Sequence, residues 1–312
     1  MHTKQEAQSS LLKWYSQNGR FSLPWRQTSE IYHIYISEIM LQQTQVSRVQ
    51  EHYYPLFLER YPTIKDLANS SLDDLLATWS GLGYYSRARN LHKAAQICAK
   101  EGFPNSPKGF LKLPGIGKYT ASAICSFALN QNISVVDTNI ARVLKRLFAL
   151  QDPKDAIIWE YADSFLNHQN PKEHNLALMD LGSLICTPKE PKCQECPLEP
   201  FCKGKENPTL YTQSKKVKYE SLELFLGLFI KGGKLALVKS KERLYHSLLT
   251  LPHTDPIEEN FIGKFKHSYT KYRIDVHLYK IEECSEEIIW YDIKNLESAP
   301  ISSLTKKALQ FL

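Results

Sequence analysis

Four of the seven cysteines of this 312-residue chain lie in one short segment, at Cys186, Cys193, Cys196 and Cys202. The first ten residues are polar, so we expect no export signal, and in a reducing compartment such a cluster indicates metal binding rather than disulfides. The intervals of six, two and five residues differ from the two equal CxxC-like pairs that are usual in a structural zinc site. They favour a four-cysteine iron–sulfur cluster. The segment must therefore fold so that four sulfur atoms surround one inorganic group.

The composition narrows the class of protein. Hydrophobic residues make up 43% of the chain and charged residues 23%, and no run of eighteen apolar residues occurs. These values predict a soluble globular protein rather than a membrane protein or a disordered chain. The net charge of +6 permits a polyanionic partner without requiring one, because the excess of basic residues is spread evenly along the chain. We expect a cytoplasmic protein with no membrane partner.

Apolar spacing divides the chain into a helical part and a smaller mixed part. Helical stripes recur over the first two hundred residues, as in 31–53, where most apolar residues are three or four apart. Residues 207–218 are polar and basic and contain a proline, which is typical of a linker. Short β-type runs follow at 222–230, 235–238, 272–281 and 288–293, with a closing helix at 302–311. The predicted fold is mainly α, with a helical domain at 1–206 and a small α+β domain at 219–312.

A glycine-containing turn separates two of the helical stretches. Gly115 and Gly117 allow a tight turn, and the amides that open the next helix, beside Lys118, lack intrahelical partners. Such a turn can bind one phosphate through its N–H groups. An ordinary turn between two helices gives the same pattern, so both interpretations stay open on this segment alone.

Two carboxylates are candidates for acid–base chemistry. Glu38 lies on a helical stripe with Ile34 and Leu41, where burial would raise the pKa of its carboxyl group towards the value that a general acid needs near neutral pH. The alternative is a partly exposed glutamate at the edge of the stripe. Asp137 follows Val136 at a predicted helix start, where the alternative role is that of a plain N-cap.

Several motifs in one order resemble a known family. Residues 113–120 read LPGIGKYT, residues 136–139 read VDTN, and the cysteine cluster follows them. This combination is similar to the helix-hairpin-helix DNA glycosylase superfamily that includes endonuclease III. Within it, Trp25-Arg26, residues 37–44 (SEIMLQQT) and residues 81–85 (GLGYY) resemble the adenine DNA glycosylase (MutY) family. The resemblance covers about residues 8–205 and continues weakly through the second domain, which in that family is a Nudix-like reader of 8-oxoguanine.

The resemblance implies an enzyme that hydrolyses the bond between base and sugar. Glu38 would protonate the imidazole-ring nitrogen of a flipped adenine, and Asp137 would stabilise positive charge on the sugar, much as paired carboxylates do in glycoside hydrolysis. Tyr119 and Asn139 complete the implied catalytic set. In bifunctional members a lysine at the position of Tyr119 forms a Schiff base, which a phenol cannot form. The resemblance therefore implies a monofunctional glycosylase that leaves an abasic site.

The resemblance also implies binding roles for further residues. Those expected to line the adenine pocket are Trp25, Arg26, Leu41 and Asp180. Those expected to fill the gap in the duplex and contact the opposite base are Gln43, Thr44, Leu82 and Tyr84. Those expected to hold DNA phosphate are Gly115, Gly117 and Lys118. The four cysteines would bind a 4Fe-4S cluster, and the expected partner is double-stranded DNA with an adenine mispair, bound by a monomer associated with the nucleoid.

The second domain departs from the family pattern. Tyr269-Thr270-Lys271 stands where the family has a Phe-Ser-His loop that reads 8-oxoguanine, so Thr270 is the candidate reader of the opposite base. Lys271 replaces an imidazole by a cation, for which we favour a phosphate contact. The domain has no convincing Nudix hydrolase signature, and we expect no pyrophosphatase activity.

Three functions stay open on the sequence. The first is an adenine glycosylase that acts opposite 8-oxoguanine or guanine, which Trp25-Arg26 and the second domain favour. The second is a related mismatch glycosylase for thymine, or one with relaxed opposite-base specificity. The third is a DNA-binding homologue without catalysis. The joint presence of Glu38, Tyr119, Asp137 and Asn139 argues against the third function, since binding alone requires none of them.

Overall fold

The computed structural model describes residues 3–212, 218–242 and 244–312, so part of the predicted linker, residues 213–217, lies outside the described residues. Its helices are α1 (Lys4–Asn18), α2 (Ile31–Leu41), α3 (Val46–Arg48), α4 (Tyr54–Arg60), α5 (Ile64–Asn69), α6 (Leu72–Thr78), α7 (Ser86–Glu101), α8 (Pro107–Phe110), α9 (Lys118–Phe127), α10 (Thr138–Leu147), α11 (Asp155–Phe165), α12 (Pro171–Leu184) and α13 (Ser303–Ala308). Its strands are β1 (Glu220–Leu228), β2 (Ile230–Lys231), β3 (Lys234–Lys239), β4 (Leu249–Thr250), β5 (Phe261–Tyr269), β6 (Tyr272–Lys280) and β7 (Ile288–Asp292).

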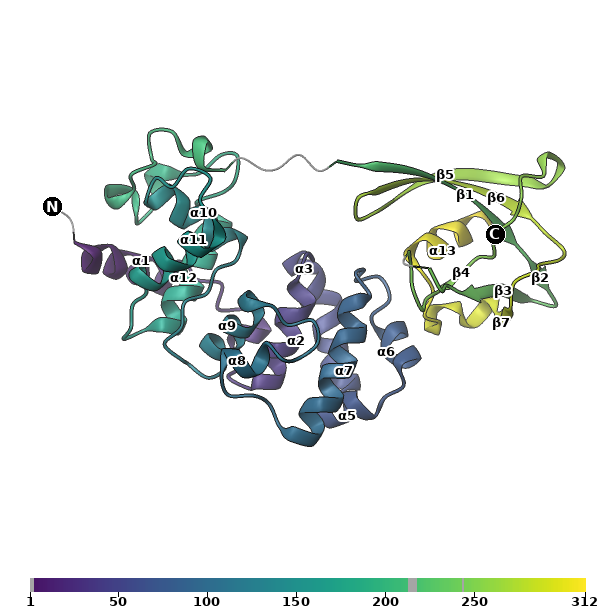
Figure 1. Ribbon diagram of the computed structural model, residues 1–312, viewed down its shortest axis with the longest axis horizontal. Helices are drawn as coiled ribbons and strands as arrows, with labels where there is room; N and C mark the ends of the chain where they lie inside the picture. The colour runs from purple at the N-terminus through teal and green to yellow at the C-terminus, as the bar shows by residue number, and fades with distance from the viewer. Residues whose placement is uncertain (1–2, 213–217, 243) are drawn as a thin grey trace. The chain divides into compact units, whose positions relative to one another are not determined.

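The chain forms two compact units. The first comprises Met1–Ile64 and Ala94–Lys215, and the second comprises Lys65–Lys93 and Lys216–Leu312. Helices fill the chain up to α12 and the strands all follow residue 219, as predicted (Figure 1). The segment Lys65–Lys93 clusters with the strands, which a periodicity argument does not reveal because an amphipathic stripe does not say which partner it packs against. The domain bounds at 206 and 219 stay predictions.

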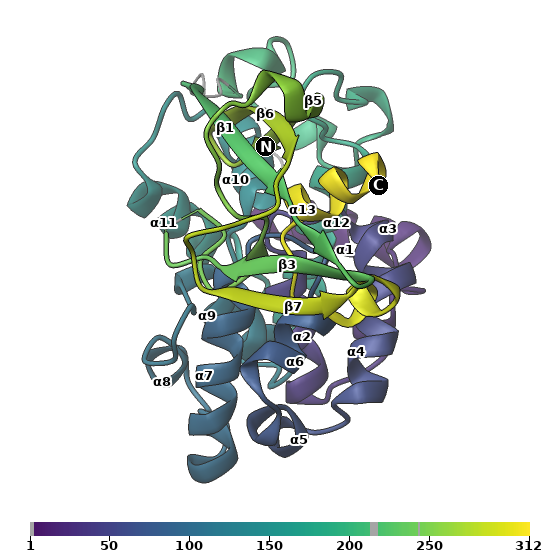
Figure 2. The ribbon, with the colours of Figure 1, turned by 90° about the vertical axis from the view of Figure 1, so that its right-hand side faces the viewer.

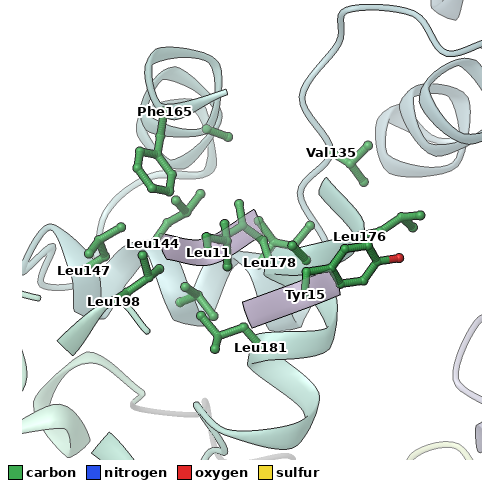
Figure 3. Close-up of a cluster of buried hydrophobic side chains, with 14 of the residues drawn as sticks. Leu11, Tyr15, Val135, Leu144, Leu147, Phe165, Leu176, Leu178, Leu181 and Leu198 are labelled. Atoms are coloured by element: carbon green, nitrogen blue, oxygen red, sulfur yellow. The ribbon is translucent and has the colours of Figure 1, made fainter. Parts of the chain in front are cut away.

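The core of the first unit lies among α1, α10, α11 and α12. Figure 3 shows its leucines converging, among them Leu11 from α1, Leu144 from α10 and Leu181 from α12, all completely buried. Full burial of one such side chain contributes about 2 kcal/mol to folding. Tyr119 and three of the clustered cysteines pack against the same core. One set of apolar contacts therefore supports both the candidate catalytic residues and the cysteine loop.

Side-chain hydrogen bonds fix how α1 begins and where it docks. Thr3 and Glu6 form a capping box, in which the Glu6 amide donates to Thr3 Oγ1 at 3.2 Å and the Thr3 amide donates to Glu6 Oε2 at 2.7 Å. The buried Gln8 amide donates to the carbonyls of Phe165 and Leu166 at 2.9 and 3.1 Å. The two Gln8 hydrogen bonds satisfy carbonyl groups at the end of α11 that would otherwise be buried without partners.

The second unit contains two sheets. In one sheet β1 pairs with β6 in parallel and β5 pairs with β6 antiparallel. In the other sheet β3 pairs with β7, which lies beside it in Figure 2, and also with the short strands β2 and β4. The apolar pattern of the sequence does not predict β5, because the lysines and the glycine of this segment weaken the alternation. Residues 265–273, which we compared with a loop, instead form the end of β5, a turn at Thr270-Lys271 and the start of β6. The predicted α+β character of this part is confirmed.

Across the described ranges, the structure contains no helix that combines the length and the apolar character needed to cross a membrane.

Candidate active site

A hydrogen bond between two helices forms the centre of the site. The Tyr119 hydroxyl at the start of α9 donates to Glu38 Oε2 in α2 at 2.7 Å. Glu38 is only 5% exposed, because α2 is buried along most of its length. The structure thus excludes the alternative of a partly exposed glutamate at the edge of the stripe.

The surroundings of Glu38 favour its protonated form. Burial raises the pKa of the Glu38 carboxyl group to about 7, an effect that the Tyr119 hydrogen bond and the charge of Arg26 reduce and the nearby Asp137 increases. Burial also raises the pKa of Tyr119 well above its ordinary value, so the phenol stays a donor. A carboxylic acid with a pKa near neutrality can deliver a proton at physiological pH.

Asp137 is both an N-cap and a member of the same cavity. Its Oδ1 accepts from the Ile140 amide at 2.7 Å, and its Oδ2 accepts from the Asn139 side-chain amide at 2.8 Å. Burial raises the pKa of Asp137, while these hydrogen bonds and the charge of Arg142 lower it. Capping does not keep the Asp137 carboxylate out of the cavity, which it lines together with Glu38.

Arg142 connects the Asp137 cap to the cysteine loop. Its guanidinium donates to Asn139 Oδ1 at 2.8 Å, to the Gly182 carbonyl at 2.6 Å and to the Cys186 carbonyl at 2.7 Å. Gly182 also lets α12 approach the start of α10 closely, because a Cβ at this position would lie 2.7 Å from the Cβ of Asn139. Neither Arg142 nor Gly182 was predicted from the sequence, where the only signal is that Arg142 lies three residues after Asn139 and Gly182 two residues after Asp180.

Glu38 and Asp137 open into a cavity of about 240 Å³. Among the residues that line it are Trp25, Arg26, Ser37, Glu38, Leu41, Thr44, Tyr119, Phe127, Asp137, Asn139, Lys172, Leu176 and Met179. Its wall consists of aromatic rings, aliphatic side chains and a few polar groups, as is typical of sites for small ligands. The structure therefore brings together the four predicted catalytic residues and three of the four predicted pocket residues.

Asp180, which we predicted in the adenine pocket, is not among the residues that line this cavity in the structure. Its carboxylate is completely buried behind the pocket wall, where Arg20 Nη2 lies 2.6 Å and Arg26 Nη2 lies 3.2 Å from Oδ1. Arg26 also donates to the Tyr15 hydroxyl at 3.1 Å. Asp180 therefore positions Arg26, which itself lines the cavity, because an unpaired buried charge would be strongly disfavoured.

The four clustered cysteines line one separate cavity in the first unit. Arg146, which is 2% exposed, crosses its wall and donates to Cys186 Sγ at 3.2 Å, to the Thr187 carbonyl at 2.7 Å and to the Pro188 carbonyl at 3.0 Å. Among the described residues, no three His, Cys, Asp or Glu side chains converge closely enough to hold a single ion. The donor set still fits an inorganic cluster, since the four cysteines and the buried Arg146 line a common space.

The glycine turn has the predicted form, between α8 and α9. Gly115 has a φ of +77°, which favours glycine. Gly117 is the exposed N-cap of α9, and a Cβ there would meet nothing within 4 Å, so the protein itself leaves room for a ligand at this backbone. The Lys118 ammonium lies 3.9 Å from the centre of the Trp159 ring, a cation–π contact that the sequence did not suggest.

The predicted opposite-base residues fall into both units. Gln43 is exposed with a φ of +56°, and Thr44 lines the catalytic cavity. In the second unit Tyr84 has a φ of +49°, a strained conformation of a kind that clusters at functional sites. Leu82 is only 6% exposed and packs as a core residue in this structure, so its contact with the opposite base stays a prediction. Arg87, itself buried, donates to the carbonyls of Leu82 and Gly83 at 3.3 and 3.2 Å and thereby fixes this turn.

The turn between β5 and β6 belongs to the same unit as Tyr84. Thr270 has a φ of +52° in that turn. Lys271 Nζ pairs with Glu220 Oε1 at 2.5 Å. Because this ammonium group already has an anionic partner, it is less available for the predicted contact with a DNA phosphate. Burial raises the pKa of the Tyr269 phenol, with smaller effects from Arg89, Tyr85 and Tyr84. The structure thus places Tyr84 near the turn that we compared with the lesion-reading loop.

The sequence matches one protein family and several related enzymes. The family described as "HhH-GPD superfamily base excision DNA repair protein" matches residues 36–165. An adenine DNA glycosylase of Buchnera aphidicola subsp. Baizongia pistaciae is 33% identical over 97% of this chain and 96% of the relative. The human adenine DNA glycosylase is 40% identical over 63% of this chain and 39% of its own length.

Solved structures show a similar fold. A thermostable thymine-DNA glycosylase has a TM-score of 0.61 at 28% identity, covering 65% of this chain and 96% of that protein. Endonuclease III in a non-covalent complex with DNA has a TM-score of 0.58 at 22% identity, covering 66% of this chain and 98% of that protein. The helix-hairpin-helix glycosylase fold that we predicted is thereby confirmed.

Proposed function

The chain belongs to the adenine DNA glycosylases of the HhH-GPD base excision repair superfamily, and from that membership we propose how it excises adenine and from which mispair. It is a DNA-binding repair enzyme that removes adenine. We propose in addition that it acts as a monomer on adenine opposite 8-oxoguanine or guanine in duplex DNA. The observation that carries the chemistry is the Tyr119–Glu38 hydrogen bond beside Asp137 in one cavity.

The proposed reaction uses the two carboxylates in different protonation states. A base inside a duplex cannot reach Glu38, so the adenine first flips into the cavity. Protonated Glu38 gives its proton to N7 of adenine, the bond from N9 to the sugar breaks, and adenine leaves as a neutral molecule. Asp137 stabilises the positive charge on the sugar. A water molecule then adds to the anomeric carbon and returns a proton to Glu38, which leaves an abasic site.

The hydrogen-bond environments of the two carboxylates support this division. Burial raises the pKa of both groups, that of Glu38 to about 7. Glu38 has one direct donor, whereas two direct donors and the charge of Arg142 oppose the rise at Asp137 and favour its ionised form. Environments that favour the protonated form of one carboxyl group and the ionised form of another are a general way to obtain one acid and one anion.

The mispair is the part of the function to test first. Duplexes carry adenine, thymine or uracil opposite 8-oxoguanine, guanine or thymine, and excision is scored by strand cleavage with and without alkali. We expect alkali-dependent cleavage at adenine opposite 8-oxoguanine and guanine. Preferred excision of thymine, as the name of the thymine-DNA glycosylase would suggest, contradicts the proposal, and so does equal excision of adenine opposite thymine.

Replacing Tyr119 by lysine tests the monofunctional assignment. We expect Tyr119→Lys to form a covalent protein–DNA complex that borohydride traps, because an amine at this position faces the sugar where the phenol cannot form an imine. The wild type is expected to trap at a level at least about tenfold lower. A double variant that also carries Lys118→Ala is the control, since it excludes trapping through the neighbouring lysine. A variant that excises adenine but traps no DNA would contradict the position we give to Tyr119.

We propose that Cys186, Cys193, Cys196 and Cys202 hold a 4Fe-4S cluster. The support is the sequence spacing, the shared cavity and the buried Arg146 beside Cys186 Sγ. When bound, such a cluster cross-links the loop and supplies no step of base excision. The Nudix-like character of the second unit and its part in reading 8-oxoguanine are likewise proposed, on the resemblance and on the place of Tyr84 and Thr270 in that unit.

Replacing Cys196 by serine tests the cluster. We expect Cys196→Ser to lose bound iron and visible absorbance and to melt at least about 5 °C lower, the shift expected for a loss of roughly 2 kcal/mol in a domain of this size. Cys284→Ser is the matched control, because Cys284 lies in the second unit outside the cluster. Stoichiometric zinc without visible absorbance in the wild type would contradict the iron–sulfur assignment.

A further inference from the structure

Lys172 lies in the catalytic cavity without a role in the reaction described above. It shares one face of α12 with Leu176 and Met179, at spacings of four and three residues, and all three side chains line the cavity. Leu176 and Met179 supply apolar wall. Lys172, a half-buried residue, adds an ammonium group to this wall.

The local chemistry of Lys172 gives it no structural reason to be a lysine. It is the second residue of α12, where the positive end of the helix dipole disfavours a cation. Within residues 3–212, 218–242 and 244–312, no hydrogen bond or ion pair of its side chain is found. A residue that breaks a local rule without a compensating contact is more often explained by function than by stability.

Lys172 and the contact between Gly182 and Asn139 lie at opposite ends of α12. At the other end of the helix, Gly182 packs against Asn139, which is hydrogen-bonded to the sugar-facing Asp137. Lys172 precedes Gly182 by ten residues, roughly 15 Å along the helix axis. Arg26, which contacts Met179, is the cation that acts on Glu38. Lys172 therefore lines the same cavity as both carboxylates from the end of α12 that is remote from Gly182.

We propose that Lys172 determines base specificity by donating a hydrogen bond to N1 of the flipped adenine. This inference rests on the proposed function and adds a contact to it. In adenine N1 is the ring nitrogen farthest from the glycosidic bond, and it is a hydrogen-bond acceptor. In guanine and hypoxanthine N1 carries a hydrogen. An ammonium group can only donate hydrogen bonds. It can therefore pair with N1 of adenine, whereas the N–H group at N1 of guanine or hypoxanthine repels it.

The test combines Lys172→Met with 1-deazaadenine, in which a C–H group replaces N1. Single-turnover excision opposite 8-oxoguanine is measured for both proteins on both bases at saturating enzyme. We expect Lys172→Met to excise adenine about 10–100-fold more slowly than the wild type, the size of a lost charge-assisted hydrogen bond. We expect the two proteins to excise 1-deazaadenine at the same rate, because the contact is already absent.

Controls separate this role from others. Lys13→Met removes an exposed lysine of α1 and is expected to keep the wild-type rate on adenine. The melting temperature of Lys172→Met is expected to equal or exceed that of the wild type, since the helix start loses an unfavourable charge. An equal fall on adenine and 1-deazaadenine, with a salt dependence flatter by about one unit, would identify a phosphate contact and overturn the proposal. An unchanged rate on adenine would overturn it as well. A wild type that excises no adenine would instead refute the proposed function.

Discussion

Glu38→Gln is expected to lower single-turnover adenine excision by about 10²–10⁴-fold while leaving the affinity for mispaired duplex nearly unchanged. Glutamine keeps the size of the side chain and can still accept the Tyr119 hydrogen bond, but it has no acidic proton to deliver. Excision and binding are measured on the same duplex, by quenched-flow assay and by titration. The matched control is Glu59→Gln, an exposed glutamate of α4.

The pH dependence of the same rate follows from the pKa of Glu38. Because that pKa is about 7 and the proton is needed, excision by the wild type is expected to fall about tenfold per pH unit above pH 7. Below pH 7 the carboxyl group stays protonated, and its titration no longer changes the excision rate. A wild-type rate that is constant from pH 6 to 9, or a Glu38→Gln rate near that of the wild type, would remove Glu38 as the acid.

The same substitution is expected to stabilise the protein at high pH. The folded-state pKa of Glu38, about 7, lies above its ordinary value of 4.5, so the stability that protonated Glu38 contributes is present below pH 4.5 and is lost as pH rises through 7. The loss amounts to about 3 kcal/mol at most. Glutamine does not ionise, and the melting temperature of Glu38→Gln should therefore exceed that of the wild type by more at pH 8 than at pH 5.

Asp137→Asn is expected to reduce excision by about 10²–10³-fold without a large loss of stability. Asparagine caps a helix as well as aspartate does and can still accept from the Ile140 amide. It lacks the negative charge that opposes the positive sugar, and removing one such preorganised electrostatic contact has an effect of this size. The measurement is the single-turnover rate at saturating enzyme together with the melting temperature.

Asp137→Ala separates the cap from the chemistry. Alanine removes the charge and the cap together, so its rate should match that of Asp137→Asn while its free energy of unfolding falls by about 1 kcal/mol more. Should Asp137→Asn retain the wild-type rate while Asp137→Ala loses it, the residue would act on the rate only by holding α10 in place.

The sequence by itself determined the elements that depend on local patterns. Apolar spacing predicted the helical part and most of the strands, and the glycine turn with the motifs at Glu38, Asp137 and the four cysteines identified the family. It could not separate a functional role from a structural one for Asp137, because an N-cap and a catalytic carboxylate have the same local signature. It missed β5, whose lysines obscure the alternation of a strand.

Only the tertiary structure decided which side chains meet. Glu38 and Tyr119 are 81 residues apart and share a hydrogen bond of 2.7 Å, and their burial is what moves the pKa of Glu38 to about 7. Asp180 was expected in the pocket, yet α12 turns it towards two arginines, while Lys172 and Leu176 on another part of the same helix face the cavity. Helical periodicity indicates which residues share a face. It does not indicate what that face contacts, because the partners come from distant segments whose packing depends on the whole core.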